Sequence, residues 1–486
     1  DTHNTAVGFE AGNAVTTGVQ NTIVGSQAGD ALTDADLNVA VGYQALSADT
    51  KGSRNIAIGY SALFSQNFTS STNSFNTAVG DSAGQQVTTG TLNTFIGGLS
   101  GDATTTGQFN TAVGYNSLTS NTTASFNCAI GMESLRENTT GTNNTSVGGY
   151  QTLIVNTTGS NNTAVGRTAL SANTTADNNT AVGFESLKVN TTGHENTASG
   201  RRSMVSNTTG SDNTGFGNAA LFSNTTASAN TAVGSGVAGS ITTGAGNVAV
   251  GHDAMNGTDD GEFNVAIGKA ALSANCGDGN TAVGKQALTA CTGGSNTALG
   301  LVAGLGVTSG SNNILLGFNA GRAGSPGGNV TTGSNIVGIG GDGISAAHIQ
   351  VDWTVASDQR DKTDFTALDL GLDFVKALAP VTYKWDKRSK YGDKTADDYD
   401  LNAQSPDGTH KEDWLDIGFK AQEVEALEQA AGYNKSNKTN LVSSHTSDGK
   451  QMGLQYSKFV PILVKAIQEQ NALIVALTAR ITTLEG

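Results

Sequence analysis

The chain has 486 residues and a formal net charge of −15. This charge argues against nucleic acid or an anionic membrane surface as a partner, because both bind clustered Lys and Arg side chains. No run of eighteen or more apolar residues and no signal-like leading segment is present, so the sequence predicts no membrane insertion and no secretory leader.

Composition divides the chain into two unequal parts. All three Trp and all four Pro lie beyond Ser325, and the preceding residues are mostly Gly, Ala, Asn, Thr, Ser and Val. Such a segment has few large side chains for a globular core, yet it has a phased apolar pattern that disordered segments lack. We therefore expect a repeat β shaft over residues 1–340, a linker over 341–356 and a separate domain over 357–486.

A seventeen-residue repeat fills the first part. The motif Asn-Thr-Ala-Val-Gly recurs with this spacing up to Asn313, and a degenerate copy stands near Asn335. Insertions follow Asn55 and Asn313, and two shortened copies begin at Asn264 and Asn280. A fixed period of this length predicts stacked coils, each of which buries its face against its neighbours. The expected fold is mainly β, a fibrous β-roll or β-helix.

Within each repeat the short strand alternates between two faces. Because successive side chains of a strand point to opposite faces, Asn, Ala and Gly lie on one face and Thr and Val on the other. We expect the bulkier Thr and Val face to point inward and to join a ladder of leucines from the following Ala-Leu or Ser-Leu pair. These leucines are Leu46, Leu63, Leu118, Leu135, Leu170 and Leu187. The bare Ala and Gly face would let another backbone approach closely.

The turn after these leucines carries Asn-Thr-Thr in seven successive repeats. Its asparagines are Asn121, Asn138, Asn156, Asn173, Asn190, Asn207 and Asn224. Stacking would align them in a ladder of amide hydrogen bonds, whereas the alternative is a row of solvated turn residues. Asn-Thr-Thr is also a glycosylation acceptor motif.

Two of the three cysteines occupy the turns of the shortened repeats. Stacked turns lie about 4.8 Å apart, which nearly brings Cys276 and Cys291 within disulfide distance. Assembly in a reducing cytosol would instead leave two free thiols. Cys128 replaces the strand Thr, so we expect it to face the interior as a small apolar residue.

The repeats resemble the heads of trimeric autotransporter adhesins and the shafts of phage fibres. The resemblance implies a β-roll that forms a homotrimer, although the adhesin unit is shorter than seventeen residues. An interwoven triple helix, in which three chains share each turn, is the competing geometry. Because Asp1 stands so close to the first repeat, we also expect an anchoring region upstream.

Four motifs follow in order after residue 350. They are Ser357-Asp358-Gln359-Arg360-Asp361-Lys362, Ala379-Pro380-Val381-Thr382-Tyr383-Lys384-Trp385, Ile417-Gly418-Phe419-Lys420-Ala421-Gln422-Glu423-Val424-Glu425 and Leu454-Gln455-Tyr456. The set resembles the intramolecular chaperone domain of phage endosialidases, tailspikes and neck appendages. The resemblance implies a small α+β domain that trimerises, sets the fibre in register and then cuts itself off at the serine of the first motif.

In this sequence that serine is Ser357, Lys362 is the implied base and the bond cut is Ala356-Ser357. A serine hydroxyl needs a base, and a lysine serves only when burial or nearby charge lowers its pKa. Asp361, beside the lysine, would hold it protonated and slow the reaction. The chain is thus at most a single-turnover serine endopeptidase acting on itself. The alternative is a surface turn with an ordinary Ser-Lys pair that has no catalytic role.

The last segment predicts a helix with a heptad seam. Its two apolar positions are held by Val460, Ile467, Ile474 and Ile481, and by Leu463, Gln470, Leu477 and Leu484. The residue types favour a two-stranded coiled coil, whereas the resemblance implies three strands. The alternative is an amphipathic helix packed on its own domain.

The leading functional hypothesis is a structural, adhesive fibre in a virion tail that attaches to a host-surface receptor, expected to be a glycan. One alternative is a bacterial trimeric surface adhesin with the same chaperone. Another is a polysaccharide-depolymerising tailspike, but acidic residues are scattered singly and do not suggest the paired carboxylates that glycoside hydrolysis needs. We expect no cofactor and no metal, because His348, His410 and His445 show no metal-ligand spacing.

Overall fold

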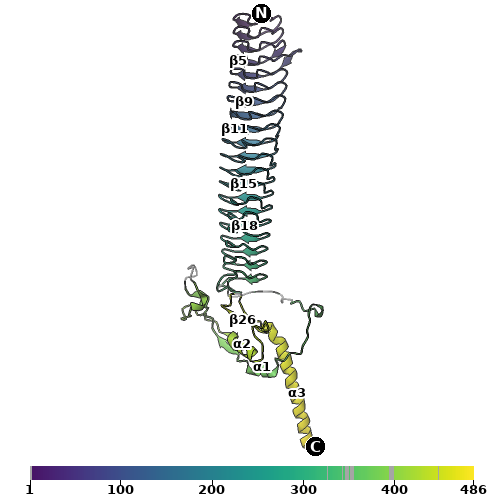
Figure 1. The fold of residues 1–486 in the computed structure, drawn as a ribbon, viewed down its shortest axis with the longest axis vertical. Helices are drawn as coiled ribbons and strands as arrows, with labels where there is room; N and C mark the ends of the chain where they lie inside the picture. Colours follow the sequence, from purple (N-terminus) through teal and green to yellow (C-terminus); the bar gives the residue numbers. More distant parts are fainter. Residues whose placement is uncertain are drawn as a thin grey trace. The chain divides into compact units, whose positions relative to one another are not determined.

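The structure is a computed structural model. It describes residues 3–325, 327–341, 343–344, 348, 350, 355–392, 399–446 and 448–486, so most of the predicted linker 341–356 lies outside the described residues. Contacts group the chain into two compact units, Asp1–Ser295 and Asn296–Gly486, which are described in turn (Figure 1).

The first unit is a column of coils, each with one three- to six-residue strand. The strands of the repeat are β1 (Thr5–Val7), β2 (Thr22–Val24), β3 (Val39–Val41), β5 (Ile56–Ile58), β7 (Thr77–Val79), β8 (Thr94–Ile96), β9 (Thr111–Val113), β10 (Cys128–Met132), β11 (Thr145–Tyr150), β12 (Thr163–Val165), β13 (Thr180–Val182), β14 (Thr197–Ser199), β15 (Thr214–Phe216), β16 (Thr231–Val233), β17 (Val248–Val250), β18 (Val265–Ile267) and β19 (Thr281–Val283). The insertion after Asn55 adds a separate parallel pair, β4 (Gly52–Ser53) with β6 (Thr72–Asn73).

Every repeat makes one full turn of a single-chain β-solenoid. Strand β1 pairs in parallel with β2 so that Thr5 lies opposite Thr22 and Val7 opposite Val24. The same one-repeat register recurs along the unit, for example between β12 and β13. The stacked coils are visible in Figure 1 from the purple to the teal part of the chain. The predicted mainly β fold of seventeen-residue repeats is confirmed.

The predicted orientation of the strand faces is wrong. In β13, Ala181 is fully buried, Thr180 is half-buried and Val182 is 39 % exposed. The reason is space, because the interior of a seventeen-residue coil is narrow and the leucine of the following turn already fills it. The leucine ladder itself is confirmed, since all six predicted leucines are fully buried. Cys128 shares the Thr position and is half-buried on the outward side, not in the interior.

The glycine that ends each strand lets consecutive coils stack closely. Gly25 has a φ of +136°, and a Cβ on it would lie 2.4 Å from the carbonyl oxygen of Gly42 in the next coil. Only glycine fits such a position, since it lacks the Cβ and adopts positive φ readily. The close backbone approach predicted at this residue is confirmed, and the approaching backbone is the next coil of the same chain.

The turn asparagines form a buried amide ladder. The Asn190 amide donates to Asn173 Oδ1 at 3.1 Å and to the Gly193 carbonyl at 2.8 Å, and its own oxygen accepts from the Asn207 amide at 2.8 Å. All seven asparagines are fully buried. The ladder alternative is therefore confirmed, and the solvated-turn and glycosylation alternatives are wrong.

The two turn cysteines occupy the same inward position as the asparagines of the ladder. Cys276 and Cys291 are buried, and both are in the reduced state. The Cys276 sulfur lies 3.3 Å from the Thr258 hydroxyl, and the Cys291 thiol donates to the Gly293 carbonyl at 3.5 Å. The disulfide alternative is thus wrong for this structure, and the two cysteines act as interior side chains.

The second unit begins with three more strands of the repeat and continues into an α+β domain. The repeat strands are β20 (Thr297–Leu299), β21 (Ile314–Leu316) and β22 (Val337–Ile339). The other elements are η1 (Gln359–Asp361), α1 (Leu372–Ala377), β23 (Val381–Tyr383), η2 (Arg388–Lys390), η3 (Leu401–Ala403), β24 (Asp416–Gly418), α2 (Ala421–Ala430), β25 (Ser443–His445), β26 (Met452–Leu454), η4 (Tyr456–Lys458) and α3 (Phe459–Glu485).

Two antiparallel strand pairs, β23 with β24 and β25 with β26, frame the α+β domain. Its core consists of Leu370, Phe374, Val424, Val442, Phe459 and Ile462. The core side chains come from the segment around α1, from α2, from the residue before β25 and from the start of α3. The predicted small α+β domain with a terminal helix is therefore confirmed.

Candidate functional site

A short turn organises the first motif. Asp358 caps η1 by accepting the Arg360 backbone N–H at 2.9 Å. The Arg360 guanidinium returns to the same carboxylate, with its terminal nitrogen 2.6 Å from Asp358 Oδ2. These bonds lower the pKa of the Asp358 carboxyl and raise the pKa of the Arg360 guanidinium. The pair holds the turn closed.

The turn brings together the two residues predicted to carry the chemistry. Lys362 Nζ lies 2.6 Å from Ser357 Oγ and 3.4 Å from the Ser357 carbonyl oxygen. Ala356, Ser357 and Lys362 are all exposed. Within the described part of the chain, the ammonium group is not in an ion pair with Asp361. The distance suits proton transfer between a hydroxyl and an amine.

The three later motifs meet at one surface of the domain. Strands β23 and β24, which carry the second and third motifs, pair so that Tyr383 lies opposite Asp416. The Asp416 carboxylate accepts the Trp385 indole N–H at 3.3 Å and the Tyr383 hydroxyl at 3.4 Å. The Tyr456 ring of the fourth motif lies 6.4 Å from that of Phe419. A shallow hollow of about 470 Å³ opens between these rings.

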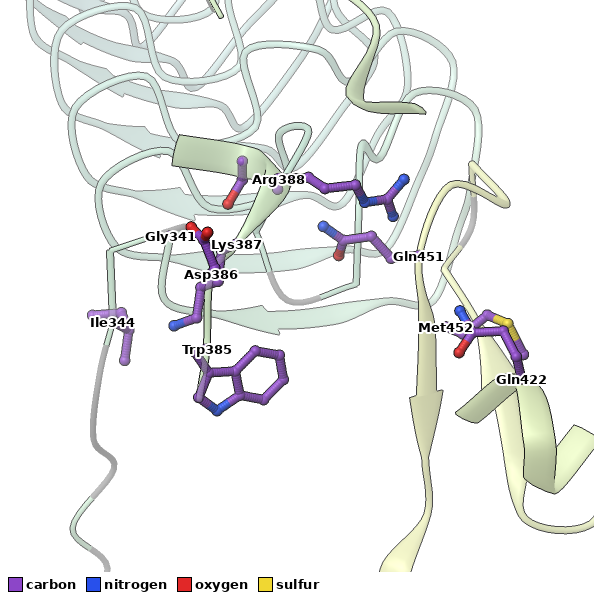
Figure 2. A pocket seen from close by; sticks show the side chains of 11 residues that line it. Gly341, Ile344, Trp385, Asp386, Lys387, Arg388, Gln422, Gln451 and Met452 are labelled. Carbon is purple, nitrogen blue, oxygen red and sulfur yellow. The ribbon is translucent and has the colours of Figure 1, made fainter. Parts of the chain in front are cut away.

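A second, more polar hollow of about 410 Å³ lies nearby (Figure 2). Trp385, Asp386, Lys387 and Arg388 line it. The Arg388 guanidinium is already bound to the Lys450 carbonyl and to Asn402, both at 2.8 Å. Because the Arg388 guanidinium is already bound within the chain, we do not assign an anion site to this hollow. No group of three or more potential metal ligands occurs among the residues that the structure describes.

One comparison with known families bears on this domain. Residues 357–433 match the family described as chaperone of endosialidase. The match begins at Ser357 and, with the repeat solenoid, fits an endosialidase-type fibre with a carboxy-terminal chaperone. No curated protein and no solved structure matches the chain. Residues 357–486 are called the chaperone domain below.

A buried carboxylate that the motifs did not reveal stabilises the chaperone domain. Glu428 of α2 is fully buried and accepts the backbone N–H groups of Leu441, Val442 and Ser443 at 2.6–3.0 Å. The Ser443 hydroxyl donates to it as well. One turn earlier, Glu425 lies 2.7 Å from His445 Nε2. Glu428 lies four residues after the apolar Val424, and this helical spacing is the only sequence signal that placed it inward.

The terminal helix exposes the seam that the heptads predicted. The buried side chains of α3 are Phe459, Ile462 and Ala466, all in its first third. The exposed apolar seam residues are Val460, Leu463, Ile467, Ile474, Leu477, Ile481 and Leu484. The alternative of a helix packed on its own domain therefore holds only for the first third of α3, through residues outside the seam. The coiled coil stays a prediction.

The same helix also has the length and composition of a membrane span. Among the described residues, Tyr456–Glu485 is one helix long and apolar enough to cross a membrane by length and composition. The sequence has no run of eighteen apolar residues here, because Lys465, Glu469 and Arg480 interrupt the apolar residues of the helix. Core helices of soluble proteins share this length and composition.

Proposed function

We propose that the chain is a homotrimeric attachment fibre whose chaperone domain brings three copies into register. The match at residues 357–433 supports this, because its family implies a homotrimeric fibre. The exposed seam of α3 supports it as well, since apolar heptads outside a coiled coil leave unfavourable surface in water. The seam is thus proposed to form a three-stranded coiled coil.

The chaperone domain is further proposed to cut the bond between Ala356 and Ser357. The Ser357 hydroxyl attacks the Ala356 carbonyl carbon while Lys362, as a neutral amine, takes the hydroxyl proton. The C–N bond breaks as the C–O ester bond forms, and the proton passes to the departing Ser357 nitrogen. Water then hydrolyses the ester, which leaves a carboxylate on Ala356 and a free hydroxyl on the new amino-terminal Ser357.

Assembly is proposed to control this reaction. The 2.6 Å contact between Lys362 and Ser357 is already formed in the single chain, but both side chains are exposed there. Burial disfavours a charged ammonium and lowers the pKa of a lysine. Packing of a partner subunit over the motif would therefore supply the neutral base, so that only assembled fibres release the chaperone.

The test compares the wild type with Ser357→Ala by denaturing electrophoresis and by light scattering. We expect wild-type trimers to release a fragment of about 130 residues, counted from 357 to 486, and the variant to remain an intact trimer. Thr363→Ala, which removes a neighbouring exposed hydroxyl, is the control and should cleave normally. Cleavage of Ser357→Ala at the wild-type rate would exclude Ser357 as the nucleophile.

The proposed location is a phage tail, and the proposed receptor is a host-surface glycan. The chaperone family supports a phage tail or surface fibre. A bacterial surface adhesin with the same chaperone is the alternative location. Binding of purified trimers to host cells before and after periodate oxidation of surface glycans tests the receptor, since unchanged binding would exclude a glycan.

A further inference from the structure

The outward face of the solenoid strands forms an apolar strip along the whole first unit. We call its two rows the Thr row and the Val row, after the commonest residue at the first and third strand positions. Neither row contains a charged residue in any repeat. Members of the Val row such as Val24, Ile96 and Phe216 are 36 %, 40 % and 45 % exposed. A strip of β-branched side chains is thus left uncovered in the single chain.

The size of this strip indicates a partner. Strands β1–β19 without β4 and β6 give seventeen coils, and the strip runs over all of them without a charged residue. Patches on most monomers are smaller, and a stable interface buries about 800 Å² per partner. A rod with the same coil spacing covers such a strip best, and a second copy of this chain is such a rod.

Charge restricts contact between two copies to the same face. Each chain carries a net charge of −15, so identical chains repel one another unless they meet through uncharged surface. The Thr and Val rows provide that surface over every coil.

Two further columns flank the strip. The leading column is the residue before each strand Asn, and the trailing column is the residue after each strand Gly. Side chains stack along each column within one chain: Phe109 on Phe126 in the leading column at 4.8 Å, and Tyr43 on Tyr60 in the trailing column at 5.5 Å. These four rings are 44–56 % exposed, so the columns extend the apolar strip at both edges.

Cyclic symmetry fixes which columns meet. Rotation about an axis parallel to the solenoid keeps each coil at the same height. If the three strips face that axis, all strands run around it in the same sense. The trailing column of one copy then meets the leading column of the next at the same coil.

In four coils the residues at the two columns are complementary. Apolar residues stand at both columns in the coils of Leu37 with Tyr43, Phe109 with Tyr115 and Phe126 with Met132. Opposite charges stand at Glu195 and Arg201, and no coil of the unit places like charges at the two columns.

The pair Glu195 and Arg201 cannot form within one chain. The two residues flank the extended strand β14, and six extended residues span roughly 20 Å. Both side chains are exposed, and neither is in an ion pair among the described residues.

We propose that the Thr and Val rows form the seam of the homotrimer, with Glu195 of each copy beside Arg201 of the partner subunit. This inference rests on the proposed trimer. It adds the face, the register and the residues through which the shafts pack.

Cysteine cross-linking tests the seam in the full chain with Cys128→Thr, which removes the outward native thiol. Glu195→Cys with Arg201→Cys should give covalent trimers on mild oxidation, because each copy then bonds to both neighbours. Glu195→Cys with Asn218→Cys, displaced by one coil, is the matched control and should remain largely unlinked.

The outcomes separate the two proposals. Two results would overturn the proposed seam but not the proposed trimeric fibre. In both, light scattering shows trimers, but either residues 195 and 201 do not cross-link or residues 195 and 218 cross-link instead. Monomers would overturn the trimer itself.

Charge reversal gives an independent measure. Glu195→Arg should lower the thermal stability of the trimer by placing two arginines together, and added Arg201→Glu should restore it. Equal loss in the single and double variants would contradict the pairing.

Discussion

Replacing Asn190 by alanine removes one rung from the middle of the buried amide ladder. The change deletes the bonds that the Asn190 amide donates to Asn173 and to the Gly193 carbonyl, and the bond that it accepts from Asn207. All three partners lie inside the solenoid, where water cannot replace the lost group. Each net hydrogen bond contributes about 1 kcal/mol, and each buried group left without a partner costs about 1–3 kcal/mol. We expect a local loss of about 3–5 kcal/mol.

Asn224→Ala is the matched control because Asn224 ends the ladder. Its amide donates to Asn207 at 2.6 Å and to the Ala227 carbonyl at 3.2 Å. Its oxygen is buried without a hydrogen-bond partner, since the next inward residue is Ile241. Alanine here removes two bonds but also an unsatisfied acceptor, so we expect a loss of about 1–2 kcal/mol.

Hydrogen exchange measured by mass spectrometry resolves the two variants, because solenoid coils open locally. For each variant, the acceleration of exchange around the substituted residue is measured relative to the wild type. The difference of about 2 kcal/mol makes this acceleration roughly thirtyfold larger in Asn190→Ala than in Asn224→Ala. Equal effects, or no acceleration in Asn190→Ala, would refute the claim that the ladder stabilises the shaft.

Three further predictions concern the solenoid. Gly200→Ala should destabilise it by about 3 kcal/mol or more in thermal unfolding, because the new Cβ would lie 2.3 Å from the Gly217 carbonyl oxygen at a φ of +137°; Gly149→Ala, where no atom lies within 4 Å, should change little. Burial raises the pKa of the Asp49 carboxyl above its ordinary 3.8, although a hydrogen bond from Gln66 acts in the opposite direction. The folded state therefore binds the proton more tightly, so local stability should fall as pH rises from 3.8 through the raised pKa, and Asp49→Asn should flatten that dependence in exchange measurements at pH 4 and pH 7. A thiol count on unfolded protein prepared without reductant should give three thiols per chain, and a count of one would contradict the reduced state of Cys276 and Cys291.

The sequence predicted the coil but not which strand face points inward. Spacing alone indicated stacked turns, and the inward leucines such as Leu187 followed from it. Alternation along β13 separates Ala181 from Val182 but does not say which is inside. The volume of the coil decides this, since Leu187 and Asn190 leave room opposite them only for alanine. The outward Val row is proposed to serve contacts between copies, which a single repeat does not reveal.

The contact between Ser357 and Lys362 has a local origin. Ser357 and Lys362 are five residues apart, and the cap formed by Asp358 and Arg360 folds that short segment on itself. Glu428 was missed because its partners, the N–H groups of residues 441–443, are distant in sequence. Local spacing predicts local contacts, whereas burial of a carboxylate depends on the tertiary fold.

The mass of the assembled chain, measured by light scattering with and without residues 357–486, tests the central claim most directly. We expect the full-length chain to form trimers of 49.2 kDa subunits before any processing. Chains synthesised without residues 357–486 should be insoluble or misregistered, because identical repeats offer many slipped alignments of similar energy. Soluble, fully trimeric shafts made without the chaperone domain, or monomeric full-length protein, would contradict the proposal of a chaperone-assembled fibre.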